Sequence, residues 1–259
     1  MEPLTYSTYL CLDEILGAQR PRSDEPDELL FIVIHQVYEL WFKELLHELE
    51  RLHAHFQASA VQAALDTLRR VLTILKVAVA QVDVLETMTP RQFTGFRSRL
   101  EEASGFQSVQ FRQLEALLGR RDPGLLRGHP AGDPGRAAIE ARMSAPSVFD
   151  GFCRFLAGRG HPIPASVLER DVGTPYEGSE AVEEVLLAVY CEEGPEALLA
   201  ERLVDLDEGL QEWRYRHVKM VERTIGDKAG TGGSSGVDYL RTTLFTPAFP
   251  DLWALRRRL

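Results

Sequence analysis

Apolar residues recur at helical spacing over long stretches of this chain. Between residues 60 and 86 they return every three or four positions, which places them on one face of a single long helix. A helix of this kind is stable only when its apolar stripe packs against other helices. The 259 residues contain no convincing strand alternation and no internal repeat. We therefore predict an all-α helical bundle that forms one domain over residues 1–259.

Residues 27–56 predict a second long helix, apolar nearly all round in its first half and amphipathic in its second. We expect the first half to be buried on most sides. Thr89 and Pro90 indicate an N-cap followed by proline at the first helical position. Gly, Pro and Arg are frequent after residue 119, so we expect 120–175 to be a surface excursion with a short helix. Shorter helices are predicted over 5–18, 106–119, 146–158 and 178–200.

The charge and cysteine content exclude several functional classes. A net charge of −10 argues against general nucleic-acid binding, which requires a basic surface. The three cysteines are widely spaced, without a C-x-x-C motif, so neither a disulfide scaffold nor a zinc site is expected. No apolar run has membrane-spanning length and the N-terminus lacks a signal-peptide pattern, so we expect a cytoplasmic protein without membrane contact.

Two histidines lie on apolar helical stripes. His217 follows Trp213 by one turn in an amphipathic stretch that begins near residue 203 and stops at Gly226. A glycine-rich run over 230–236 comes directly afterwards. His35 lies in the apolar half of the 27–56 helix. Taken alone, a histidine in such a position is typical of a core residue whose ring nitrogens are hydrogen-bonded, so the pattern by itself leaves a ligand role open.

Four segments resemble tryptophan 2,3-dioxygenases, in that family's own order. They are TYSTYLCLDEIL, DELLFIVIHQVYELWFKELLHEL, LETMTPRQFTGFRSRLEEASGFQSVQFR and WRYRHVKMVERTIGDKAGTGGSSGVDYLR. The resemblance implies an all-α enzyme that binds haem b, ferrous in its active state, and assembles as a homotetramer, a dimer of dimers. It implies the first step of tryptophan catabolism by the kynurenine route. In that step both atoms of O2 are inserted across the indole C2–C3 bond of L-tryptophan, giving N-formyl-L-kynurenine.

The resemblance also assigns roles to residues. His217 is implied as the axial ligand of the haem iron, with Trp213 and Ser104 beside the haem. His35 is implied as the catalytic residue near the indole nitrogen, and Phe31 and Phe93 as walls of the indole slot. Arg97 is expected to pair with the substrate carboxylate, and Thr231 to contact the carboxylate and ammonium. Residues implied to reach into a neighbouring subunit's site are Tyr6, Tyr9 and Leu10.

Two features depart from the family pattern, and other functions are possible. The chain is short for the family, with no clear match over 120–200, and Pro26 alters the start of the helix that carries His35. One alternative is a haem-dependent monooxygenase of another indole or aromatic compound in secondary metabolism. A haem sensor or carrier would need His217 but has no use for Arg97, and a helical scaffold would use both histidines as core residues. Arg97 and Thr231 together favour an amino-acid substrate.

Overall fold

The computed structural model describes residues 3–226, 240, 241 and 243–259. Every regular element within these residues is a helix, which confirms the predicted all-α class. The α-helices are α1 (Tyr6–Tyr9), α2 (Leu12–Leu16), α3 (Asp27–Gln57), α4 (Val61–Leu85), α5 (Pro90–Arg97), α6 (Val109–Leu117), α7 (Pro134–Met143), α8 (Val148–Gly158), α9 (Ala165–Leu168), α10 (Glu180–Cys191), α11 (Pro195–Ile225) and α13 (Pro250–Ala254). The short 3-10 helices are η1 (Ser98–Leu100), η2 (Gly105–Gln107), η3 (Pro123–Leu126) and η4 (Leu255–Arg258).

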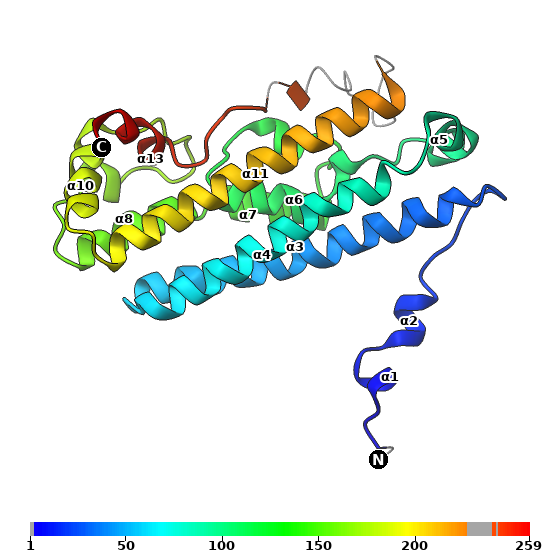
Figure 1. The fold of residues 1–259 in the computed structure, drawn as a ribbon, viewed down its shortest axis with the longest axis horizontal. Coiled ribbons are helices and arrows are strands. Elements are labelled where there is room, and N and C mark those ends of the chain that lie inside the picture. The colour runs from blue at the N-terminus through cyan, green and yellow to red at the C-terminus, as the bar shows by residue number, and fades with distance from the viewer. Residues whose placement is uncertain (1–2, 227–239, 242) are drawn as a thin grey trace.

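Three long helices form the frame of the molecule. In Figure 1, α3, α4 and α11 run side by side, and both α3 and α11 pack against α4. Helices α6 and α8 pack against α3, whereas α10 and α13 gather at one end and α5 lies at the other. Among the described residues, no helix is both long enough and apolar enough to cross a membrane.

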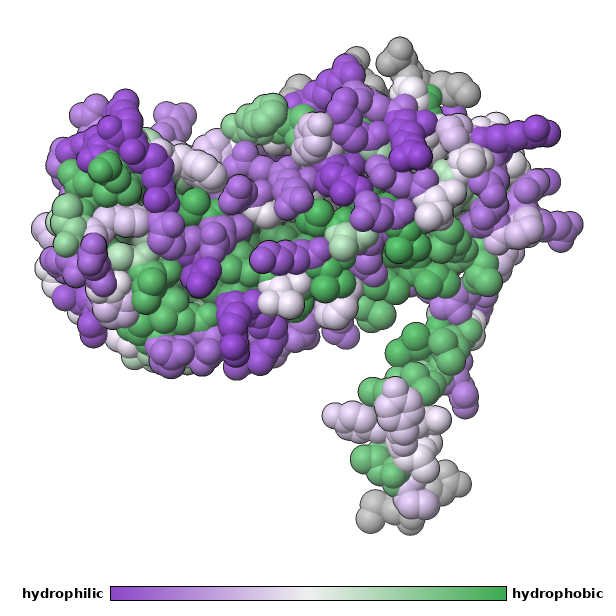
Figure 2. Space-filling model, viewed as in Figure 1, coloured by the Kyte–Doolittle hydropathy of each residue, from purple (hydrophilic) through white to green (hydrophobic). Residues whose placement is uncertain are grey.

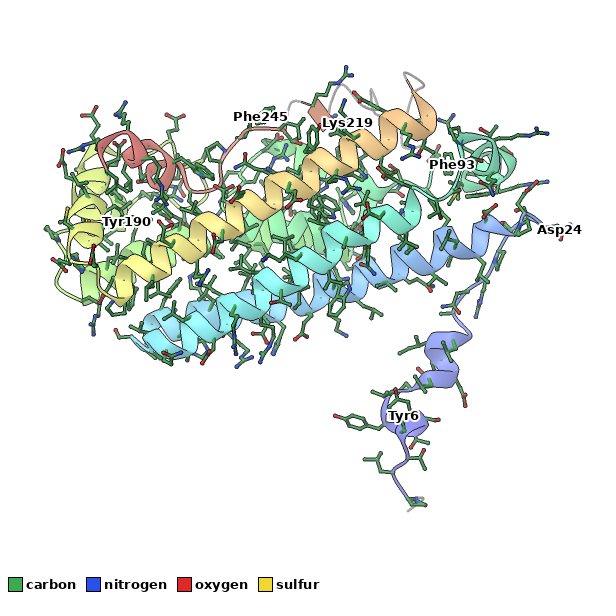
Figure 3. The ribbon with its side chains drawn as sticks, in the orientation of Figure 1. Tyr6, Asp24, Phe93, Tyr190, Lys219 and Phe245 are labelled. Atoms are coloured by element: carbon green, nitrogen blue, oxygen red, sulfur yellow. The ribbon has the colours of Figure 1, made fainter. Side chains whose placement is uncertain are left out.

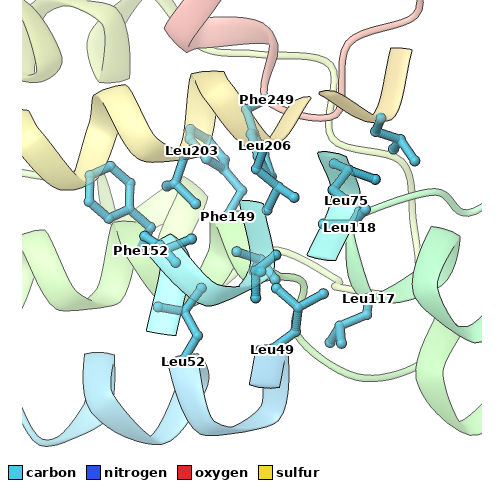
Figure 4. Close-up of a cluster of buried hydrophobic side chains, with 14 of the residues drawn as sticks. Leu49, Leu52, Leu75, Leu117, Leu118, Phe149, Phe152, Leu203, Leu206 and Phe249 are labelled. Carbon is cyan, nitrogen blue, oxygen red and sulfur yellow. The ribbon is translucent and has the colours of Figure 1, made fainter. Parts of the chain in front are cut away.

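The main hydrophobic core lies where the long helices meet α8. Leu52 of α3, Phe152 of α8 and Leu203 of α11 are each 0% exposed, and Figure 4 shows them within one cluster. Burying a side chain of this size stabilises the fold by roughly 1.5–3 kcal/mol. Phe152 also contacts the ring of Phe56, at a centroid distance of 5.8 Å. This end of the bundle is therefore close-packed.

Several predicted helices agree with the structure, and others differ for identifiable reasons. The long helices α3 and α4 lie within one residue of their predicted bounds. The predicted 178–200 helix is wrong, because Glu193 has a φ of +51° and the chain turns before Pro195 opens α11. The helix that carries His217 therefore begins at residue 195 rather than near 203. Similarly, Cys11 has a φ of +51° and divides the predicted 5–18 helix into α1 and α2. Helix α6 starts at Val109, because Ser108 caps it.

The predicted short helix over 146–158 agrees with α8, but the prediction that 120–175 is a surface excursion is wrong. This segment contains η3, α7, α8 and α9, and α7 packs against α6. Leu125 and Ile139 are both 0% exposed and form a second, smaller core with Ala116 of α6. The glycines and prolines that suggested a loop stand mainly at turns and helix starts, as Pro134 does in α7. Composition alone did not reveal the apolar residues between them.

The first half of α3 is more exposed than predicted. Leu29, Val33 and Leu40 are 48%, 37% and 54% exposed, so one face of this apolar half has no partner within the described chain. The N-terminal arm, α1 and α2, stands away from the body in Figure 1. Figure 2 shows apolar side chains on this arm, where Leu4 and Leu16 are more than 70% exposed. Both features are apolar surfaces that another molecule could bury.

Candidate functional site

A cavity of about 230 Å³ lies at the end of the bundle opposite the close-packed core. Its walls come from α3, the C-terminal end of α4, α5, α6 and α11, with Leu240 and Thr243 of the C-terminal tail. Six sequence-predicted site residues line it: His35, Phe93, Arg97, Ser104, Trp213 and His217. Residues more than a hundred positions apart in the sequence are thus brought to one cavity.

His217 is presented by α11 and supported by Trp213 one turn earlier. The two rings are stacked, with centroids 5.2 Å apart and an interplanar angle of 3°. Trp213 in turn packs against Phe42 and Phe111. The ring of His217 makes no hydrogen bond to any other described residue. It therefore lacks the partner that a core histidine normally has.

His217 is a neutral imidazole. Burial, the His35 ring and the charge of Arg112 lower the pKa of His217 to about 4. At neutral pH one ring nitrogen then keeps a free lone pair, which is the form that binds a metal ion. An uncharged imidazole donor in a cavity with aromatic walls fits a ligand of haem iron.

His35 faces the same cavity from α3 with a fixed orientation. Its Nδ1 lies 2.7 Å from the carbonyl oxygen of Phe31. A carbonyl only accepts, so Nδ1 carries the proton and donates it, which leaves Nε2 as an acceptor. Burial lowers the pKa of His35, although the Phe31 carbonyl and Glu39 oppose that shift. His35 is therefore suited to accept a hydrogen bond from an N–H group of a ligand.

Helix α5 carries the predicted substrate-binding residues Phe93 and Arg97 on consecutive turns. Its start is fixed by a capping box between Thr89 and Gln92, with Pro90 at the first helical position, as predicted. Phe96 is 0% exposed and anchors the helix, while Phe93 and Arg97 turn to the cavity. Figure 3 shows Phe93 at this end of the molecule. Aromatic and guanidinium groups thus stand on one short, well-anchored helix.

Phe31 is not part of the cavity wall. Its ring lies behind the wall, 4.1 Å from the ring of His35 and 5.8 Å from that of Phe93. It therefore supports both side chains from behind. Ser104 does line the cavity, and its hydroxyl accepts a hydrogen bond from the Phe106 amide as the cap of η2.

The remaining predicted residues do not lie in this cavity. Thr231 is outside the described residues. Tyr6, Tyr9 and Leu10 are on the N-terminal arm, where they are 75%, 71% and 36% exposed. Figure 3 shows Tyr6 far from Phe93 and Lys219, which mark the end of the bundle that holds the cavity. In this conformation none of the three reaches the cavity of its own chain.

Sequence reasoning missed a charged group on the cavity wall. Glu115 of α6 is 2% exposed and is surrounded by three arginines, all of which line the cavity: Arg112, Arg120 and Arg214. Burial raises the pKa of Glu115, but the three guanidinium groups together outweigh burial and hold that pKa below its ordinary value. The i, i+3 spacing of Arg112 and Glu115 was visible in the sequence, but their pairing with Arg214 of α11 was not.

The donor set distinguishes haem from a bare metal ion. A non-haem iron site needs two histidines and a carboxylate converging on one point. Among the described residues, no group of three or more His, Cys, Asp or Glu side chains could hold a metal ion. Of the two histidines in the cavity, His35 is bonded to the Phe31 carbonyl, and His217, which has no such bond to any described residue, fits as the ligand of iron that is already held by a macrocycle. The residues present therefore fit haem.

Comparison with known proteins agrees with this chemistry. The family model for tryptophan 2,3-dioxygenase matches residues 1–126 and 184–259. Tryptophan 2,3-dioxygenase of Anaeromyxobacter sp. strain K is 65% identical over 99% of this chain and 96% of the relative. The enzymes of Herpetosiphon aurantiacus and Bacillus cereus are 54% and 43% identical, with coverage of 100% of this chain and 99% and 94% of the relatives.

These alignments correct one sequence-based expectation. The chain is not short beside these relatives, because it covers at least 94% of each. The part that the family model leaves out, residues 127–183, lies within the region for which the sequence showed no clear match. The matched parts contain the helices that form the cavity. The chain belongs to the tryptophan 2,3-dioxygenase family.

Proposed function

We propose that this protein is a haem-dependent tryptophan 2,3-dioxygenase. Haem b would be held by His217, and L-tryptophan would occupy the part of the cavity between His35 and α5. The observation that carries this proposal is the convergence of His217, His35 and Arg97 on one cavity. When bound, ferrous haem b would supply the iron chemistry that activates O2.

The residues on the substrate side suit an amino acid with a flat apolar ring. Phe93 offers an aromatic wall to the indole, backed by Phe31. The guanidinium group of Arg97 can make a bidentate, charge-assisted pair with the α-carboxylate. Such hydrogen bonds in a buried site contribute roughly 1.5–3 kcal/mol. Thr231 would contact the carboxylate and ammonium, and Ser104 would lie near the haem.

His35 acts in this proposal by positioning the indole. Its Nε2 would accept a hydrogen bond from the indole N–H, because Nδ1 is committed to the Phe31 carbonyl. The reaction breaks the C2–C3 bond and gives each carbon one oxygen atom, so both atoms of O2 enter the product and no external reductant is consumed. The proton on nitrogen is still present in the formamide product. His35 therefore needs to orient the ring without any net proton transfer.

The apolar surfaces support a proposal of assembly. As a homotetramer, a dimer of dimers, the protein would bury the exposed face of α3 and place its N-terminal arm against a neighbour's cavity. Tyr6, Tyr9 and Leu10 would then contribute to the neighbour's substrate site. The exposed leucines and tyrosines of an arm that packs on nothing in its own chain favour this arrangement.

Isotope labelling tests the proposed function. Ferrous, haem-loaded protein is given L-tryptophan under 18O2, and the product is analysed by mass spectrometry, with a parallel reaction in H2 18O as control. Two labelled atoms in N-formylkynurenine, with no product from the variant His217→Ala, would support the proposal. One labelled atom would favour a monooxygenase. Haem binding without product from L-tryptophan or other indoles would favour a sensor or carrier, and no haem uptake would favour a scaffold.

A further inference from the structure

Two of the arginines around Glu115 are held rigidly on the cavity wall. The guanidinium group of Arg112 donates to Glu115 and, through Nε, to the carbonyl oxygen of Phe106 at 3.3 Å. It also lies over the rings of Phe106 and Phe111, 5.2 and 5.7 Å from their centroids. Arg214 donates to Glu115 at 3.1 Å and to the carbonyl oxygen of Thr243 at 3.4 Å. Both side chains are thus fixed in place before any ligand arrives.

Each of these two arginines keeps a donor that the protein does not use. Arg112 Nη2 and Arg214 Nε make no hydrogen bond to another described residue. Arg112 is only 6% exposed, and the side chain of Arg214 is 11% exposed. Both side chains line the cavity, and neither donor is fully buried. These donors are therefore available to an acceptor within the cavity.

The charges on the cavity wall do not balance. Around Glu115 three arginines meet two carboxylates, Glu115 itself and Asp122, which pairs with Arg120 at 2.9 Å. Glu39 accepts a hydrogen bond from Gln110 at 2.8 Å on the α3 side. The cluster of Arg112, Arg120 and Arg214 with Glu115 and Asp122 carries an excess of one positive charge. A buried excess of this kind favours an anionic ligand.

The positions of Arg112 and Arg214 indicate which anion these two residues bind. Arg214 is three residues before His217 on α11, so the two lie on the same side of that helix, and Arg112 lines the same cavity from α6. Arg97 stands on a different helix, α5, together with the aromatic substrate wall. A carboxylate that belongs to the group bound by His217 would therefore meet Arg112 and Arg214, whereas the substrate carboxylate would meet Arg97. Haem b carries two propionate carboxylates on its rim.

We propose that Arg112 and Arg214 bind a propionate of haem b, and that Glu115 positions both guanidinium groups for it. This inference rests on the proposed haem binding. It assigns a binding role to Arg112 and Arg214, which are not among the site residues predicted from the sequence. The arginine pair would hold one rim group of the haem while His217 ligates its iron.

Haem esters test this inference without measuring activity. Wild-type protein is loaded with haem b or with its dimethyl ester, in which both propionates are uncharged, and the rate of haem loss to an excess of an acceptor apoprotein is measured. We expect the ester to leave roughly ten- to a hundredfold faster than haem b, because charge-assisted hydrogen bonds are lost. In Arg112→Gln and in Arg214→Gln, the ratio of the ester's loss rate to that of haem b should fall to a few-fold. In Arg170→Gln it should match wild type, since Arg170 pairs with the buried Asp150 away from the cavity.

Loss of one arginine leaves Glu115 with fewer partners, so folding needs its own control. The double variant Arg112→Gln/Glu115→Gln removes both charges of that pair, and its far-UV circular dichroism should match wild type. An equal rate of loss for haem b and its ester in wild-type protein would overturn the inference without any variant. A large ratio that persists in both arginine variants would overturn it as well. Failure to bind any haem would instead contradict the proposed function.

Discussion

The two ends of the helical bundle are built from the same three long helices but differ in packing. At one end, Leu52 of α3 and Leu203 of α11 are completely buried against α8 (Figure 4). At the other end, His35 of α3 and His217 of α11 face a cavity. No turn interrupts either helix between the two ends. The close-packed end can therefore hold the open end in position through continuous helices.

Because of this difference, we expect one end of the bundle to determine the free energy of unfolding and the other to determine ligand binding. Apolar side chains at the close-packed end have their contacts satisfied within the chain, so changes there should lower the free energy of unfolding. Polar side chains at the cavity have donors or acceptors that the chain does not satisfy, so changes there should alter ligand binding instead. Substitutions at the two ends should thus give separable results.

The largest expected effect is at the open end, in His217→Ala. Without the imidazole α11 presents no other histidine to the cavity, and His35 stands on α3 with Nδ1 bonded to Phe31, so we expect haem affinity to fall sharply and dioxygenase activity to reach background. The absorbance spectrum after haem titration measures this. Because His217 makes no hydrogen bond to another described residue, the melting temperature of the haem-free protein should change little. The variant His217→Gly should recover haem binding when imidazole is added, and an unchanged wild-type spectrum in His217→Ala would contradict the assignment.

The next largest effect is at the close-packed end, in Phe152→Ala. Phe152 is 0% exposed and contacts the rings of Phe56, Phe149 and Phe155. Removing it leaves a cavity and should lower the free energy of unfolding by about 3–5 kcal/mol, measured by urea denaturation. Below its melting temperature the variant should bind haem with the wild-type spectrum. A changed haem spectrum with unchanged stability would show that the two ends are not separable in this way.

A smaller effect is expected for Arg97→Gln. If Arg97 binds the substrate carboxylate, kcat/KM for L-tryptophan should fall roughly ten- to a hundredfold. Tryptamine, which lacks the carboxylate, should be affected much less, so the ratio of the two rates is the measurement. Arg91→Gln is the matched control, because Arg91 is exposed on the same helix. A similar loss for both substrates would indicate that Arg97 supports the helix rather than the carboxylate.

Much of the fold could be predicted because its signals are local. Helical periodicity located α3 and α4, and Thr89-Pro90 located the start of α5. The wrong predictions concern features that depend on tertiary contacts or on an unusual backbone conformation. The apolar first half of α3 predicted burial, yet Leu40 is 54% exposed because the described chain supplies nothing to cover it. The break at Glu193 depends on a left-handed residue that is not glycine, which the pattern did not indicate.

The site shows the same division between local and distant signals. His35, Arg97 and His217 could be named from motifs, and the structure brings them to one cavity. The sequence did not indicate that Arg112, Glu115 and Arg214 form a cluster, because α6 and α11 are about a hundred residues apart and meet only in the folded chain. Nor did it distinguish Phe31, which supports the wall, from Phe93, which forms it.

The smallest expected effect concerns pH and returns to the open end. The three arginines hold the folded-state pKa of Glu115 below its ordinary value of 4.5, even though burial raises it. A carboxyl whose pKa is depressed by folding adds stability above its unfolded pKa, and that stability is lost as the pH falls through the lower, folded value. In haem-free protein, Glu115→Gln should therefore flatten the decline of unfolding free energy below about pH 4.5. Glu101→Gln should leave the decline unchanged, because Glu101 and its partner Arg22 are both exposed and their pair is screened by solvent. If Glu115→Gln declines as steeply as wild type, the arginines do not hold the carboxylate charged, and the open end would not contain a preformed ionic cluster.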